Sequence, residues 1–225
     1  IQKYEDELSR QYPNNKHVGP KIRQTLQLLR DQGLIRFDGN GRYSQLKGSP
    51  KFSPLIDFAN AEGFSSRSQV ARLVLETWAE LNLYCVNCDS DGLVRLGANT
   101  PVADFACASC GERYQLKGKD GRFGAIVPGA AYGVMIKSVR EGNCPNYVLI
   151  EYNSRFSSVV FGWAIKGAAI TEGRVVARNP LATTAKRRGW VGCNVNVAGL
   201  PVVRIVQPEV VDPKRARAEW INYPM

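Results

Sequence analysis

The chain has 225 residues, enough for one large domain or two modest ones, each with its own hydrophobic core. Thirty Lys and Arg residues against twenty Asp and Glu residues give a formal charge of +10, which favours a polyanionic partner such as a nucleic acid. No run of about 18 apolar residues occurs, which excludes a membrane-spanning helix. Residues 1–10 lack the basic-then-apolar order of a signal peptide, so we expect a soluble, cytoplasmic protein in a reducing compartment.

Helical periodicity marks the start of the chain. Ile22, Leu26 and Leu29 recur at helical spacing, which predicts a helix over residues 18–32. A shorter helix is predicted before it, over residues 3–11.

A hairpin is predicted after these helices. Residues 34–37 and 42–46 have the composition of two short strands, and the Asp-Gly-Asn-Gly turn at residues 38–41 closes them. Two helices followed by a tight hairpin are typical of a winged helix. We therefore predict a winged-helix DNA-reading domain over residues 1–47, with a further upstream helix of that fold expected before Ile1.

The rest of the chain has mixed periodicity. Residues 48–54 are rich in Pro, Gly and Ser, which predicts a linker, and residues 55–225 then form a second domain. Helices are predicted over residues 68–81 and 130–140, and strands over residues 147–152, 159–165 and 202–206. The fold class expected for this domain is α/β (α+β).

Four of the six cysteines fall in two Cys-x-x-Cys pairs, Cys85 with Cys88 and Cys107 with Cys110. Each pair offers two thiolates from one tight turn, so the sequence predicts a zinc ribbon. Four thiolates fill a tetrahedral shell, so the zinc is expected to be structural and not catalytic. Two disulfides in a secreted chain are the alternative, which the missing leader disfavours. Cys144 and Cys193 stand alone and are expected to be buried thiols.

A possible nuclease constellation lies within and just after this ribbon. Asp104 closes the segment Pro-Val-Ala-Asp, and Gln115 and Lys117 follow eleven and thirteen positions later, on one face of a predicted strand. Phosphodiester hydrolysis needs a carboxylate to hold a divalent cation and a cation to orient or activate water, and Asp104 and Lys117 suit these roles. Surface polar residues can produce the same spacing.

A longer series of segments sharpens this interpretation. Ten short segments match the catalytic domain of one nuclease family, and they occur in the same order along the chain. They are residues 68–69, 71–72, 84–85, 88, 101–105, 107–110, 116–117, 145–146, 180–182 and 188–194. This series resembles the catalytic domain of the DpnI-like, methylation-dependent (type IIM) restriction endonucleases of the PD-(D/E)xK superfamily. Residues 21–24, 26–27, 29–31 and 39–43 resemble the winged helix of the same family. The resemblance covers most of the chain, with the two domains in reversed order.

The resemblance implies a PD-(D/E)xK core with catalytic Mg²⁺ held by Asp104 and Gln115, and with Lys117 as the catalytic lysine. It also implies cleavage of double-stranded DNA at GATC sites that contain N6-methyladenine, whose methyl group offers an apolar contact in the major groove. Gln115 departs from the family, which has Glu there. An amide still offers an oxygen but removes a negative charge, so cation affinity and rate should fall and this form can be inactive. Both a natural variant and an engineered substitution are compatible with the sequence.

Two basic regions are candidates for DNA contact. In a winged helix the second helix enters the major groove and the hairpin touches the backbone or the minor groove. This predicts contacts from the helix and the wing by His17, Lys21, Arg23, Gln24, Arg42 and Tyr43. A solvated helix face is the alternative. The resemblance also implies a DNA-contacting loop in the nuclease domain, formed by Lys186, Arg187, Arg188 and Trp190.

Two other functions remain open at this stage. Gln115 and the zinc ribbon are compatible with a non-catalytic methyl-DNA or transcription-factor-like binding protein. An RNA-binding zinc protein is less favoured, because no aromatic-rich platform is evident. We expect a monomer in solution.

Overall fold

The structure is a computed structural model that describes residues 2–11, 13, 17–31, 35–45, 53–58, 66–98, 100–155, 157–206 and 212–223. Two compact units divide the chain, Ile1–Phe52 with Pro208–Val210, and Ser53–Gln207 with Val211–Met225. Most of the predicted linker, residues 48–52, lies outside the described residues. None of the helices in the described ranges combines the length and apolarity needed to cross a bilayer.

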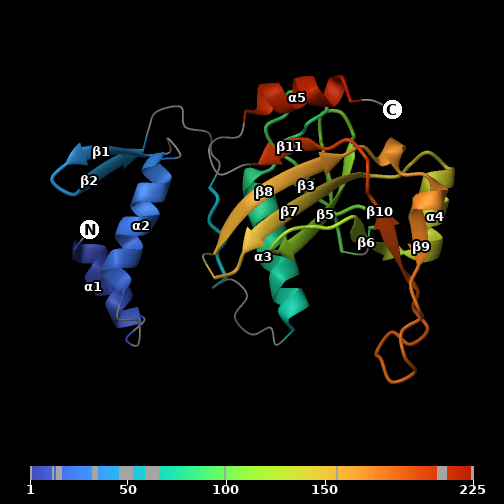
Figure 1. Cartoon of the computed structure of the whole chain (residues 1–225), viewed down its shortest axis with the longest axis horizontal. Helices are drawn as coiled ribbons and strands as arrows, with labels where there is room; N and C mark the ends of the chain where they lie inside the picture. Colours follow the sequence, from blue (N-terminus) through green and yellow to red (C-terminus); the bar gives the residue numbers. More distant parts are fainter. Residues whose placement is uncertain are drawn as a thin grey trace. The chain divides into compact units, whose positions relative to one another are not determined.

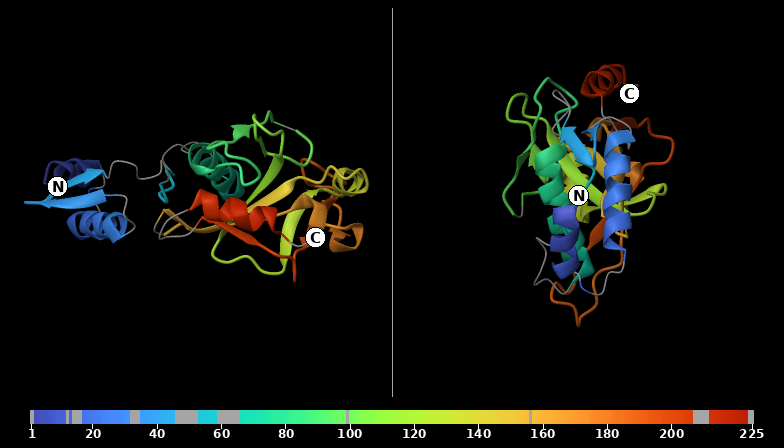
Figure 2. Two further views of the ribbon diagram at one scale, coloured as in Figure 1. Left: turned by 90° about the horizontal axis from the view of Figure 1, so that it is seen from above. Right: turned by 90° about the vertical axis from the view of Figure 1, so that its left-hand side faces the viewer.

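The smaller unit consists of helices α1 (Gln2–Gln11) and α2 (Val18–Asp31) and the hairpin of β1 (Ile35–Gly39) and β2 (Arg42–Gln45). Figure 2 shows the two helices beside the hairpin. The helices approach closely at Gly19, where an added Cβ would collide with the side chain of Glu5. The hairpin turn needs positive φ at Gly39, Asn40 and Gly41, which explains its Asn and Gly composition. This order of elements is that of a helix-turn-helix domain with a short wing.

The larger unit is built on a six-stranded mixed sheet with the order β11-β8-β7-β5-β4-β3. Figure 1 labels its long strands β8, β7 and β5. Its strands are β3 (Val94–Arg95), β4 (Phe105–Ala106), β5 (Arg113–Asp120), β7 (Asn146–Asn153), β8 (Ser158–Ile165) and β11 (Val203–Val206). β5 and β7 are parallel, and the other neighbours are antiparallel. Residues 146–152 of β7 are all buried, as expected for a central strand covered on both faces.

A second, antiparallel sheet of β6 (Ile126–Ala131), β10 (Gly192–Asn196) and β9 (Val175–Ala177) packs with helix α4 (Tyr132–Arg140). A buried cluster joins this layer to the large sheet and includes Val127, Met135, Tyr147, Leu149 and Val195. The helix predicted over residues 130–140 begins later than expected, because residues 130 and 131 end β6. The fold class is therefore α/β, as predicted, and the structure shows that the large sheet is mixed.

Two further helices complete the larger unit. Helix α3 (Arg67–Asn82) packs on β5, where Gly118 leaves room for Leu75 because a Cβ there would overlap the leucine side chain. Helix α5 (Pro213–Ile221) packs on β11 and is capped by Asp212, whose carboxylate accepts hydrogen bonds from the backbone N–H groups of Lys214 and Arg215. Sequence periodicity predicts α3 but gave no sign of α5.

Candidate functional site

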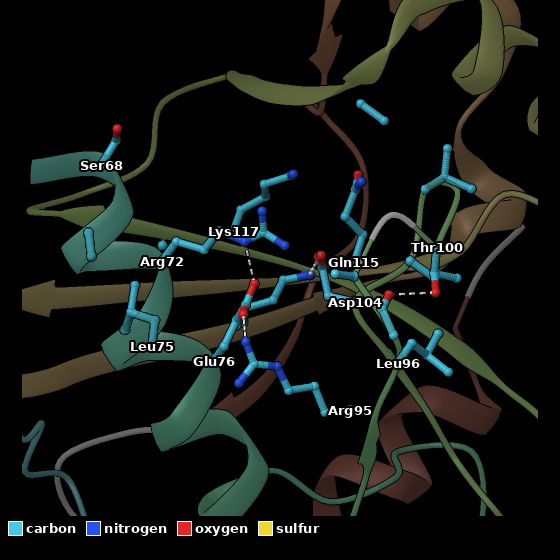
Figure 3. A pocket seen from close by; sticks show the side chains of 18 of the residues that line it. Ser68, Arg72, Leu75, Glu76, Arg95, Leu96, Thr100, Asp104, Gln115 and Lys117 are labelled. Carbon is cyan, nitrogen blue, oxygen red and sulfur yellow. Dashed lines mark hydrogen bonds and ion pairs between the residues drawn. The ribbon is translucent and has the colours of Figure 1, made fainter. Parts of the chain in front are cut away.

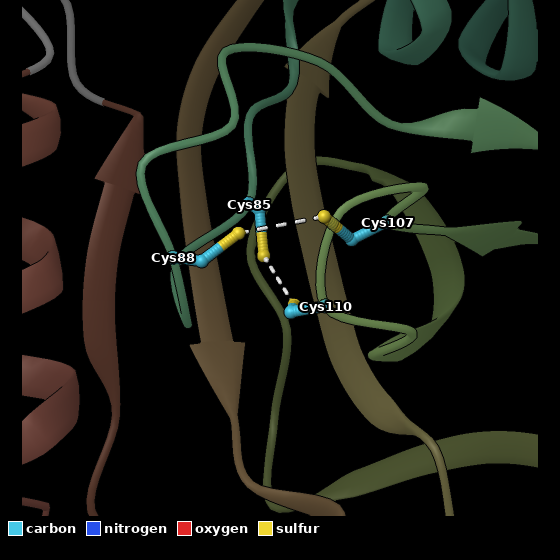
Figure 4. Close-up of side chains that lie close together, drawn as sticks. All are labelled: Cys85, Cys88, Cys107 and Cys110. Carbon is cyan, nitrogen blue, oxygen red and sulfur yellow. Dashed lines mark hydrogen bonds between the residues drawn. The ribbon is translucent and has the colours of Figure 1, made fainter.

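The four paired cysteines meet in one cluster. Their Sγ atoms all lie within 4.8 Å of one another, with Cys85 to Cys110 at 3.6 Å and Cys88 to Cys107 at 3.5 Å (Figure 4). All four are free thiols, so the two-disulfide alternative does not describe this structure. A Zn–S bond of about 2.3 Å in a tetrahedron separates the sulfur atoms by about 3.8 Å, which these distances approach. The cluster can therefore hold a metal ion such as zinc.

Groups around the cluster stabilise its sulfur atoms and loops. Burial acts to raise the pKa of Cys107. Hydrogen bonds from the backbone N–H groups of Cys110 and Ser109 and from the neighbouring thiols outweigh this effect and lower the pKa to about 6. The hydroxyl of buried Tyr114 lies 3.1 Å from the Cys85 sulfur. Arg217 of α5 donates to the backbone oxygens of Cys85 and Ser90, at 3.0 and 2.9 Å, and so ties the first cysteine turn to the C-terminal helix.

Asp104 is held where β5 extends beyond its short neighbour β4. β4 pairs with β5 only at Arg113 and Tyr114, so the next residues of β5 border a pocket of about 540 Å³. The backbone N–H of Asp104 donates to the backbone carbonyl oxygen of Tyr114 at 2.8 Å, and the Asp104 carboxylate accepts a hydrogen bond from the Leu116 N–H at 2.9 Å. Two residues earlier, Val102 has a φ of 52°, which is a strained conformation for a β-branched residue. Asp104 is thus fixed at the pocket by two hydrogen bonds to the backbone of β5, one from its own N–H and one to its carboxylate.

Gln115 and Lys117 line the same pocket as Asp104 (Figure 3). The sequence grouped these three residues by their spacing, their alternation in a strand and the family resemblance, and the structure brings them together around one cavity. Gln115 is only 4% exposed, and its Oε1 has no hydrogen-bond partner within the described part of the chain. Buried polar atoms ordinarily have partners, so this oxygen is a candidate ligand atom for a group bound in the pocket. Burial lowers the pKa of Lys117, and the carboxylate of Asp104 opposes part of that effect.

We expect Lys117→Met to remove a pH-dependent part of the stability. Folding lowers the pKa of Lys117 below its usual 10.5, so the unfolded chain holds this proton more tightly. The contribution of Lys117 to the free energy of unfolding therefore rises with pH, from the folded-state pKa up to 10.5. Urea titrations should show the difference, unmodified chain minus variant, growing with pH in that window. A flat or falling difference contradicts a lowered pKa, and Lys119→Met, at an exposed lysine of the same strand, is the control.

The proposed DNA-contacting residues of the smaller unit lie on α2 and at its start, and on the hairpin. His17, Lys21 and Gln24 are exposed and recur at helical spacing at the start of α2. Arg23 is also exposed, but helical geometry places it about 120° around the axis from this stripe. Arg42 is exposed on β2, and Tyr43 is half-buried against Phe37, with their rings 5.1 Å apart.

Residues 186–190 lie in the loop between β9 and β10. The loop is closed by backbone hydrogen bonds from Leu181 to Trp190 and from Gly189 to Leu181, at 2.9 and 3.0 Å. Lys186, Arg187 and Arg188 are exposed, and the Arg187 guanidinium stacks 5.0 Å from the centre of the Trp190 ring. Arg187 also lines the pocket of Asp104, whereas Lys186, Arg188 and Trp190 do not.

Three charged pocket residues were missed by sequence reasoning. Arg72 and Glu76 come from α3, and Arg95 comes from β3 inside the ribbon. Arg72 and Glu76 have the i, i+4 spacing of a helical ion pair, which could have flagged them. No local signal connects either residue to Arg95.

Comparison with known families agrees with this architecture. The profile described as the Dam-replacing family matches residues 55–222, and the profile of the Dam-replacing HTH domain matches residues 1–45. The two profiles occur in the reverse of the order found in DpnI-like enzymes, as the sequence resemblance indicates. This family implies DNA binding and methylation-dependent restriction. The first profile spans well over half of the 225 residues of this chain, so the chain belongs to the Dam-replacing family.

Proposed function

We propose that this protein is an Mg²⁺-dependent endonuclease that cleaves double-stranded DNA at GATC sites carrying N6-methyladenine. The observation that carries the proposal is that Asp104, Gln115 and Lys117 line one pocket in a chain of the Dam-replacing family. The GATC sequence and the methylated base come from the family resemblance. In this proposal the core is of the PD-(D/E)xK type, with Gln115 at the second acidic position.

The side chains of the pocket suit a magnesium ion. Asp104 and Gln115 would hold it, because both offer the hard oxygen ligands that Mg²⁺ prefers, and Gln115 Oε1 lacks another partner among the described residues. When bound, the ion would supply positive charge that polarises the phosphoryl oxygens. Lys117, whose pKa burial lowers, would orient the attacking water and take up its proton. The hydrogen bond from the Leu116 N–H would keep the Asp104 carboxylate in place during this step.

The metal of the cysteine cluster is, in this proposal, structural zinc. Cys85, Cys88, Cys107 and Cys110 fill a tetrahedral shell, so no position remains for a water or a substrate. The zinc would affect cleavage indirectly, by holding in place the segment between the two cysteine pairs. That segment includes Asp104.

DNA reading is proposed to involve both units. In the smaller unit, the exposed stripe of His17, Lys21 and Gln24 would face the major groove, and Arg42 and Tyr43 would contact the backbone. Arg23 would contact a phosphate beside the groove. In the larger unit, Lys186, Arg187 and Arg188 would bind phosphates, and Trp190 would contact a base.

Cleavage of matched plasmids tests the proposal. Plasmid with and without adenine methylation at GATC is incubated with the chain, and with its Gln115→Glu variant, in Mg²⁺ or Mn²⁺. Cutting of the methylated plasmid alone supports the nuclease. If neither protein cuts under any of these conditions, the nuclease proposal fails.

A non-catalytic methyl-DNA reader is the second candidate, and one observation favours it. The pocket is lined by two carboxylates, and Glu76 uses both oxygens on Arg72 and Arg95. With an amide at position 115, Asp104 is the lining carboxylate left for a cation. A reader predicts methyl-dependent binding of duplex DNA without metal-dependent nicking by either protein.

A further inference from the structure

A buried carboxylate joins two arginines in the wall of the pocket. Glu76 is only 5% exposed and accepts Arg72 Nε on Oε1 at 2.5 Å and Arg95 Nη2 on Oε2 (Figure 3). Arg72 lies one helical turn away on α3, whereas Arg95 comes from β3 in the ribbon. One acidic side chain therefore fixes two guanidinium groups that reach the pocket from different elements.

The two guanidinium groups remain open to a ligand. The Arg72 and Arg95 side chains are 66% and 38% exposed, against 7% for the Glu76 side chain. Each arginine contacts Glu76 through a single nitrogen, and a guanidinium has five N–H donors, so most donors of each arginine are not used by Glu76. Because Glu76 is buried and held from both sides, the arginines lose less freedom when they bind than mobile surface side chains would.

The charge of the pocket indicates what these donors bind. The pocket is lined by Arg72, Arg95, Lys117 and Arg187 against two carboxylates, so it attracts an anion. A phosphodiester presents two non-bridging oxygens, which match the paired donors of a guanidinium. Arg72 is also close enough to Asp104 and to Lys117 for their charges to interact, so a bound phosphate would lie beside both.

We propose that Arg72 and Arg95, held by Glu76, form a clamp for one phosphate of the DNA strand that lies against Asp104 and Lys117. The clamp rests on the proposed function, because DNA must enter this pocket, but it does not require that the chain cuts the DNA. It adds a positioning role for Glu76, which acts through the arginines. It also gives the ribbon a part in DNA binding, because β3 carries Arg95.

Binding without cleavage tests the clamp. Fluorescence anisotropy in a metal-free buffer measures the affinity for a labelled duplex with a methylated GATC site, and for duplexes with one neutral methylphosphonate at successive positions. We expect one or two positions at which the neutral linkage weakens binding by the unmodified chain about tenfold. In Arg72→Ala and in Arg95→Ala, the same linkage should weaken binding less than about twofold, because the arginine contact is already lost.

Two more variants separate the clamp from general effects. Glu76→Gln keeps the shape of the side chain but removes the charge that aligns both arginines, so the loss at the neutral linkage should fall to about threefold. Arg215→Ala is the matched control, because Arg215 forms the same i, i+4 pair with Glu219 at 2.8 Å but does not line the pocket. It should keep the full tenfold loss. Arg72→Lys, which keeps the charge, checks the result if Arg72→Ala fails to fold.

The clamp is overturned if no neutral linkage weakens binding by the unmodified chain. It is also overturned if both arginine variants lose as much affinity at that linkage as the unmodified chain does. Failure of the nuclease proposal would appear separately, as absence of plasmid cleavage with the binding pattern intact.

Discussion

Replacing Gln115 by Glu should raise the rate of cleavage of adenine-methylated plasmid by on the order of a hundredfold. Gln115 is buried in the pocket beside Asp104, and its Oε1 has no partner in the described ranges of the chain. A carboxylate there doubles the negative charge available to a divalent cation, because Glu76 is engaged by Arg72 and Arg95. The Mg²⁺ concentration that gives half-maximal cleavage should fall as well.

Two measurements check this result. Initial rates of nicking across an Mg²⁺ series compare the unmodified chain with Gln115→Glu, and calorimetric titration with Ca²⁺ reports cation binding without turnover. Gln69→Glu is the control, because Gln69 is an exposed residue of α3 that does not line the pocket but carries the same change of charge. The double variant Asp104→Ala with Gln115→Glu should be inactive. If Gln115→Glu gains neither cation affinity nor rate, this pocket is not the magnesium site.

Features with local determinants could be predicted from the sequence. The two Cys-x-x-Cys pairs form one cluster because each pair takes its two ligands from a single turn. Helices α2 and α3 lie within one residue of their predicted ends, since their apolar spacing repeats over several turns. The prediction that Gln115 and Lys117 share one site with Asp104 rested on their alternation in a strand and on the family resemblance, and both residues line the pocket.

Features that depend on distant pairing could not be predicted in this way. β3 and β4 have two residues each, too few for any periodicity, yet they carry Arg95 and flank Asp104. The segment of β6 contains Pro128 and Gly129, which disfavour a strand, but β6 is an edge strand and pairs with β10 on one side only. Gly129 is needed there, because an added Cβ would overlap the Cys193 sulfur. The Glu76–Arg95 contact likewise exists only after the ribbon packs on α3.

Breaking the cysteine cluster should abolish cleavage as well as lower stability. The chain between Cys88 and Cys107 contains β3, β4 and Asp104, so a metal that joins the two cysteine pairs closes the loop that carries the proposed catalytic carboxylate. We expect Cys107→Ser to lower the free energy of unfolding by at least about 3 kcal/mol, because structural zinc contributes directly to folding. Cys144→Ser, outside the cluster, is the matched control and should bind as much zinc as the unmodified chain.

Three readouts on the same protein separate these effects. Metal analysis should find one zinc per unmodified chain and much less in Cys107→Ser, and thermal melts should follow the zinc content. Cleavage is assayed in proteins that also carry Gln115→Glu, with excess Mg²⁺. A lower cleavage rate then reflects the loss of zinc and not weak binding of the proposed catalytic ion. Arg217 still ties Cys85 to α5 after the metal is gone, so the fold of the large sheet should persist while Asp104 and Arg95 lose their places. A protein that has lost its zinc but cuts at the full rate would show that the ribbon does not position the pocket.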